Sequence, residues 1–137
     1  MGAAWGVQAS QGGGMKHIGL FLAAVALPGL AAAADAKWTF IAGSDTGADF
    51  FVKEGSRVEV SEPRGPAFQI DVKHVRPNGQ VNLIRLQASK ADCKKGQGLL
   101  YEYAMDGEQR HRNDFALNTN TTAAAMAHYI CTGNVKP

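Results

Sequence analysis

The sequence has few of the features that mark an enzyme, a nucleic-acid-binding protein or a membrane-spanning protein. Its 137 residues include no G-x-S-x-G elbow, phosphate-binding loop or dinucleotide fingerprint. No apolar run after Asp35 is long enough to cross a bilayer. Charge is scattered, with 14 Lys and Arg against 12 Asp and Glu, so we expect no nucleic-acid partner. These absences predict one small non-enzymatic domain without a cofactor.

Residue spacing typical of metal sites is also lacking. His74, His111 and His128 fall on a predicted strand, loop and helix, without H-x-x-x-H or H-E-x-x-H spacing. The only two cysteines, Cys93 and Cys131, have no C-x-x-C neighbour. We therefore expect no metal site.

Basic residues occur in two short runs. Arg110, His111 and Arg112 would form a basic patch with Lys94 and Lys95 if the fold brought the two runs together. The other interpretation is a pair of solvated loops, in which the charges serve only to keep the surface polar.

The N-terminus predicts export. Met15-Lys16-His17 precedes an apolar run over 18–30 and an alanine-rich segment over 31–34, which is the layout of a secretory signal peptide. The apolar run is too short for a membrane anchor and is interrupted by Pro28-Gly29.

The chain divides into three segments by this reasoning. Residues 15–34 are the signal peptide, with cleavage before Asp35 preferred and cleavage before Lys37 as the alternative. Residues 1–14 have two open interpretations, a misassigned start with translation from Met15 or a disordered extension. Residues 35–137 form the mature domain, which has no membrane span after signal cleavage and resides in the periplasm, at the cell surface or outside the cell.

The central stretch from Ala67 to Ala88 predicts a β-hairpin. Two runs with apolar and polar residues alternating flank Pro77-Asn78-Gly79, a strong turn signal. Phe68, Ile70 and Val72 share the face that we expect to be buried. A lone hairpin cannot bury that face, so other elements must cover it.

Shorter strands are predicted on both sides of this hairpin. Aromatic and β-branched residues indicate strands over 37–42, 50–52 and 57–62, the first two joined in a second hairpin by the turn 43–49. The segment 99–105 is the last strand.

The last predicted strand carries two tyrosines. Leu99, Tyr101, Tyr103 and Met105 share a parity, and because Leu99 and Met105 are apolar we expect them on the core face. The other interpretation displays the two tyrosines on an exposed face. The segments 90–98 and 108–114 flank this strand and are predicted as a polar loop and a polar connector.

The C-terminal segment changes from strand to helix period. Apolar residues recur at helical spacing, namely Ala123, Met126, Ala127 and Ile130. Asn118, Thr119 or Asn120 can cap this helix at its start, and Gly133 can end it. The predicted fold class is α+β, a single small antiparallel sheet of about six strands with the C-terminal helix packed on it and one disulfide.

The disulfide is predicted between Cys93 and Cys131, because an exported domain meets an oxidising compartment. Closing this loop of roughly 40 residues stabilises the fold by about 4 kcal/mol in the chain-entropy model. The alternative, a reactive thiol, requires an activating base that the sequence does not identify.

One candidate catalytic motif is present. Asp45-Thr46-Gly47 resembles the Asp-Thr-Gly motif of retroviral-type aspartic proteases, in which two aspartates share one proton. In those families large apolar residues precede the motif, whereas in this chain Gly43-Ser44 precedes it. A solvated hairpin turn also explains this composition, and it is the simpler interpretation.

Several short motifs follow the signal peptide in a particular order. They are WTFI at 38–41, FFV at 50–52 before Gly55-Ser56, Cys93 before a tyrosine-bearing strand, and Cys131 after a helix. This order resembles the surface-adhesin E family of Gram-negative bacteria. The resemblance implies an antiparallel sheet with a C-terminal helix, and it implies adhesion to host matrix or plasma proteins.

Three functional hypotheses follow. The first is a non-enzymatic envelope protein with an adhesin-like protein-binding domain and no assigned ligand-binding residues. Its sheet edges can pair with a partner or with a second copy as a homodimer. The second is a periplasmic binding or hydrolase-inhibitor module, and the third is the aspartic protease through Asp45-Thr46-Gly47.

Overall fold

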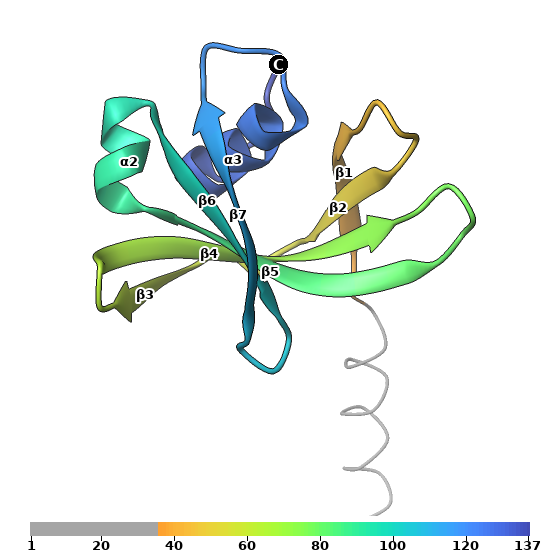
Figure 1. Cartoon of the computed structure of the whole chain (residues 1–137), viewed down its shortest axis with the longest axis horizontal. Coiled ribbons are helices and arrows are strands. Elements are labelled where there is room, and N and C mark those ends of the chain that lie inside the picture. Colours follow the sequence, from red (N-terminus) through yellow and green to blue (C-terminus); the bar gives the residue numbers. More distant parts are fainter. Residues whose placement is uncertain (1–35) are drawn as a thin grey trace, which may run out of the picture. The chain divides into compact units, whose positions relative to one another are not determined.

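The structure, a computed structural model, describes residues 36–137, and the predicted signal peptide over 15–34 and the segment 1–14 lie outside the described residues. No helix within 36–137 is long and apolar enough to cross a membrane. Figure 1 shows the order of the elements, which is β1 (Trp38–Gly43), β2 (Asp49–Lys53), β3 (Val58–Glu62), β4 (Gly65–Val75), β5 (Val81–Ser89), α2 (Lys90–Lys95), β6 (Gln97–Ala104), β7 (Gln109–Ala116) and α3 (Thr122–Thr132).

All seven strands form one antiparallel sheet. This confirms the predicted α+β class, and the sheet has one strand more than the predicted number of about six. The predicted central hairpin is β4 and β5, the two longest strands, and the predicted second hairpin is β1 and β2. The sheet order is β1-β2-β4-β5-β6-β7. β3 and β2 share one edge of β4, since β3 pairs with residues 65–69 and β2 with residues 72–75.

The core lies on the face of the sheet that carries the even-numbered residues of β4 and β5. Ile70, Val72, Ile84 and Leu86 are buried there, as the period-two pattern of the hairpin predicts. The helix α3 packs on this face through four buried residues, Ala124, Met126, Ala127 and Ile130. Thr121, and not one of residues 118–120, caps α3, and Gly133 ends it as predicted.

Two segments predicted as irregular are regular elements. The segment 108–114 belongs to the edge strand β7, where residues 109–114 are exposed and backbone pairing with β6 holds the strand. Because none of these side chains is buried, no apolar alternation marks the strand. The segment 90–98 contains the short helix α2, which buries no side chain and is fixed by its caps, Ser89 and Gly96.

The predicted core face of β6 was wrong. Leu100 and Ala104 face the core, whereas Tyr101 and Tyr103 lie on the opposite face, opposite Gln87 and Arg85 of β5. Tyr101 is nevertheless buried, because the Arg64 guanidinium lies over its ring at 3.7 Å from the ring centroid. The apolar parity that begins at Leu99 therefore marks the outer face of β6, where Arg64 covers Tyr101, and not the core face.

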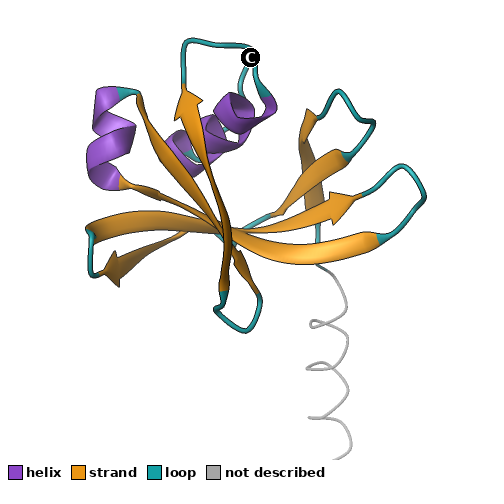
Figure 2. Ribbon diagram, in the orientation of Figure 1, coloured by secondary structure: helices purple, strands orange, loops and turns teal. Residues whose placement is uncertain are grey.

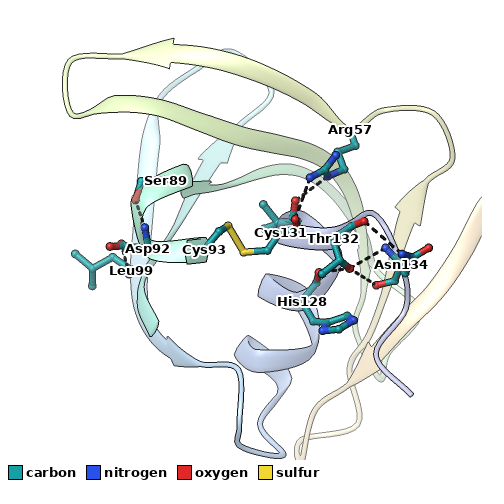
Figure 3. Close-up of a disulfide and its surroundings, with 10 residues drawn as sticks. Arg57, Ser89, Asp92, Cys93, Leu99, His128, Cys131, Thr132 and Asn134 are labelled. Atoms are coloured by element: carbon teal, nitrogen blue, oxygen red, sulfur yellow. Dashed lines mark hydrogen bonds between the residues drawn. A yellow bond between two sulfur atoms is a disulfide. The ribbon is translucent and has the colours of Figure 1, made fainter. Parts of the chain in front are cut away.

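The predicted disulfide between Cys93 and Cys131 is confirmed, and it joins α2 to α3 (Figure 3). The two helices contact each other on one side of the sheet (Figure 2). Arg57 lies beside the same junction, where its Nε and Nη2 donate to the carbonyl oxygens of Ile130 at 2.8 Å and Cys131 at 3.1 Å. A cation at a helix C-terminus also interacts favourably with the helix dipole.

Loss of the disulfide should destabilise the domain without changing its fold. Replacing both cysteines, Cys93→Ser with Cys131→Ser, should lower the free energy of unfolding by about 4 kcal/mol, because the unfolded chain regains the entropy of an open loop. Urea unfolding followed by circular dichroism measures this change. An unchanged urea midpoint would contradict the stabilising role.

Arg57 should stabilise the C-terminus of α3. Arg57→Met keeps an unbranched apolar stem but removes two charge-assisted hydrogen bonds, so the free energy of unfolding should fall by about 2 kcal/mol. Arg57→Lys retains the charge and should recover part of that loss. Thermal unfolding measures the melting temperature, which should fall from wild type to the lysine variant and again to the methionine variant. Equal melting temperatures would refute the stabilising role of Arg57.

Candidate functional site

Large apolar side chains gather on the sheet face opposite α3. Alternation along paired strands places Trp38 and Phe40 of β1, Phe51 of β2 and Leu83 of β5 on this face. Phe40 is 51% exposed, Leu83 50%, Val81 49% and Met105 40%, although each could be buried in a larger protein. We call the set the outer patch: Trp38, Phe40, Phe51, Val81, Leu83 and Met105.

Direct contacts hold the outer patch together. Phe40 and Phe51 pack edge to face with ring centroids 5.6 Å apart. The Lys73 ammonium lies 4.9 Å from the Trp38 ring centroid and 5.1 Å from that of Phe51. Trp38, Leu83 and Met105 line one small hollow of about 70 Å³. The outer patch is therefore one surface with a cation at its centre.

A groove adjoins the outer patch where the tip of the β4–β5 hairpin diverges from the β6–β7 hairpin. Its volume is about 560 Å³. We call it the hairpin groove, and its lining is Phe50, His74, Arg76, Val81, Asn82, Leu83, Ile84, Glu102, Ala104, Met105, Asp106, Arg110 and His111. Val81, Leu83 and Met105 belong to both surfaces, so the groove and the outer patch meet along the first residues of β5.

Stacked rings and charged groups give the hairpin groove its chemistry. Phe50 and His74 stack with centroids 4.5 Å apart and planes 9° from parallel. Among residues 36–137, neither Arg76 nor Arg110 forms a salt bridge. Of the two acids, Asp106 already accepts a hydrogen bond from the Glu108 backbone N–H at 2.9 Å. The groove thus holds two guanidinium groups, Arg76 and Arg110, and two carboxylates, Glu102 and Asp106, and none of the four forms a salt bridge within residues 36–137.

The backbone of β5 has a free edge in the hairpin groove. β6 pairs with β5 only from Ile84 onward, so Val81 to Leu83 have a neighbouring strand on the β4 side alone. The Arg76 N–H donates to the Gln80 carbonyl at 2.8 Å, which fixes the alternation of hydrogen bonds along this pair. The N–H and C=O groups of Val81 and Leu83 consequently point away from β4, toward the groove.

The other half of the outer face is polar and already filled. The Arg64 guanidinium covers Tyr101 and donates to the Tyr103 hydroxyl at 2.9 Å, and this hydrogen bond raises the pKa of Arg64 above its usual value. Gln87 is 5% exposed beneath this cluster and donates to the Gln69 side-chain oxygen at 2.8 Å. These contacts leave the apolar half as the accessible part of the face.

Asp45-Thr46-Gly47 lies in the turn between β1 and β2, and Asp45 is exposed. The turn is closed by the Ser44 N–H donating to Ala48 O at 2.8 Å and by a hydrogen bond between the hydroxyl groups of Ser44 and Thr46. These features are those of the hairpin turn expected from the composition.

The structure brings some predicted residues together and separates others. His74 and His111 line the hairpin groove from β4 and β7, while His128 lies on α3. Within the described range, no group of three or more His, Cys, Asp or Glu side chains is arranged to hold a metal ion. The basic patch does not form, because Lys94 and Lys95 precede β6 whereas Arg110 lies at the far end of the β6–β7 hairpin.

Comparisons of the chain with family models, with curated proteins and with solved structures give no match. The candidate surface is therefore defined by geometry. Sequence reasoning missed it because Trp38, Phe40 and Leu83 carry the ordinary signal of a half-buried strand. Only the pairing shows that α3 covers one face and leaves Phe40 and Leu83 exposed on the other.

Residues of the outer patch should contribute little to stability. Leu83→Ser should change the free energy of unfolding by about 0.5 kcal/mol, since half of the side chain is already in water. Leu86→Ala, on the buried face of the same strand, should lower it by about 3 kcal/mol. Urea unfolding of both variants tests the contrast, and a similar large loss in both would mean that Leu83 is a core residue.

Proposed function

We propose that the chain is an exported, non-enzymatic protein of the bacterial cell envelope that binds another protein through the outer patch. The observation that carries this proposal is the set of half-exposed apolar side chains on one face of the sheet. Small monomeric proteins rarely leave such side chains gathered and uncovered, and exposed apolar patches rimmed by polar residues mark protein-binding sites.

The composition of the outer patch supports this choice of partner. Aromatic residues and methionine are enriched at the centres of protein–protein interfaces, where they bury a large apolar area. Lys73 adds one cation between Trp38 and Phe51, which favours an acidic or carbonyl group on the partner.

The resemblance to the surface-adhesin E family supports a location at the cell surface. It rests on the signal peptide, on the aromatic motifs of β1 and β2, and on the positions of Cys93 and Cys131. Trp38, Phe40 and Phe51, which belong to those motifs, are also part of the outer patch. On this proposal the partner is a host matrix or plasma protein.

Location is tested by protease treatment of intact and of permeabilised cells that express the full chain, with an antibody against residues 35–137. Digestion on intact cells is the expected result. Protection until permeabilisation would contradict the adhesin proposal and would leave the periplasmic binding or inhibitor module in its place.

The binding surface is tested by photo-crosslinking in the same cells. A photoreactive amino acid at Leu83 should crosslink to a protein partner, and the same group at Val135 should not. Val135 is a matched control because it is 43% exposed, close to the 50% of Leu83, and lies outside the outer patch. Equal crosslinking at both positions, or none at Leu83, would contradict the proposed surface.

A further inference from the structure

The place where the hairpin groove meets the outer patch has the features of a site for an extended peptide. We propose that the free edge of β5 from Val81 to Leu83 binds a segment of the partner as an added strand, and that this segment alternates acidic and apolar residues. The inference rests on the proposed function, because it names the class of protein segment that the same surface binds.

The backbone groups at the start of β5 are placed to pair with an added strand. Val81 and Leu83 direct N–H and C=O groups away from β4, where β6 no longer runs beside β5. Those groups lie at an open groove and not against another strand. An extended peptide satisfies such groups with main-chain hydrogen bonds, which is the mode of recognition called β-augmentation.

The side chains around this edge indicate which residues the added strand carries. Successive residues of such a strand point to opposite faces of the sheet. On one face the peptide meets Leu83 and Met105 of the outer patch, which favour apolar residues. On the other it meets the rest of the hairpin groove, where Arg76 and Arg110 have no salt-bridge partner among residues 36–137 although Glu102 and Asp106 also line the groove. Guanidinium groups bind carboxylates in paired hydrogen bonds, so acidic residues fit that face.

Two other edges of the sheet, those of β7 and β1, are less suited to the same role. β7 is an outer strand, but its residues from Gln109 to Asp114 are all polar, which is a common protection against unwanted strand pairing. At β1, the Thr122 hydroxyl of α3 donates to the Gly43 carbonyl at 2.8 Å. The edge at Val81 to Leu83 combines free backbone groups, apolar side chains and unpaired cations.

The test uses protein recovered from cells that express the full chain and a fluorescent peptide of alternating valine and glutamate, blocked at both ends. Fluorescence anisotropy should show saturable binding. Arg76→Gln with Arg110→Gln should weaken binding at least about tenfold, the loss of roughly one charge-assisted interaction. Both arginines are exposed, so this variant should fold normally. A peptide with lysine in place of glutamate should not bind, and equal affinity for both peptides would refute the inference.

Backbone pairing is tested with two further probes. The same peptide with alternate amide nitrogens methylated keeps its side chains but cannot form a ladder, so it should lose binding. Amide hydrogen exchange should slow at Val81 and Leu83 when the unmodified peptide binds, and should stay unchanged at Val60 of β3. Binding of the methylated peptide, or slowing at Val60 alone, would overturn the added strand.

Other outcomes separate this inference from the proposed function. If Leu83 crosslinks to a partner in cells but the alternating peptide does not bind, the inference fails and the proposed function stands. If Val81 and Leu83 become protected without peptide as protein concentration rises, a second copy occupies the edge and the inference also fails.

Discussion

The antiparallel pairing of β4 with β5 is the interaction on which the rest of the structure depends. It runs without a break from Ala67 opposite Ser89 to Val75 opposite Val81, and it places Ile70, Val72, Ile84 and Leu86 on one face. Every other strand joins the sheet through one of these two strands or through a strand attached to them. The core and both candidate binding surfaces are therefore set by one register, and a shift of one residue would exchange them.

The helix α3 covers only one face of β4 and β5, and the candidate site lies on the part that it leaves uncovered. α3 packs on the core face through small residues such as Ala124 and Ala127, which let the helix approach the sheet closely. Within residues 36–137, α3 covers the core face, while Phe40 and Leu83 on the opposite face remain half exposed. The outer patch lies on the face opposite α3, and the hairpin groove adjoins it where the pairing of β5 with β6 ends.

The sequence predicted most of the fold but not the site, for reasons that particular residues make clear. The β4–β5 hairpin and the C-terminal helix follow from residue period and turn chemistry, and the Cys93–Cys131 bond was predicted from the cysteine count and the expected export, all of which are local or compositional signals. β7 and α2 were missed because backbone bonds and caps hold them while their side chains stay in water. The tyrosines of β6 were assigned to the wrong face because Arg64, distant in sequence, covers Tyr101. Such long-range contacts leave no periodic trace.

The position of Cys131 near the end of the chain has a consequence for biogenesis. Cys131 follows every strand of residues 36–137 and almost all of α3, so the disulfide can form only after the segments that make the sheet have been synthesised. With two cysteines in the whole sequence, only one intramolecular pairing is possible. The domain therefore needs an electron acceptor to mature, but it has no incorrect intramolecular bridge for an isomerase to correct.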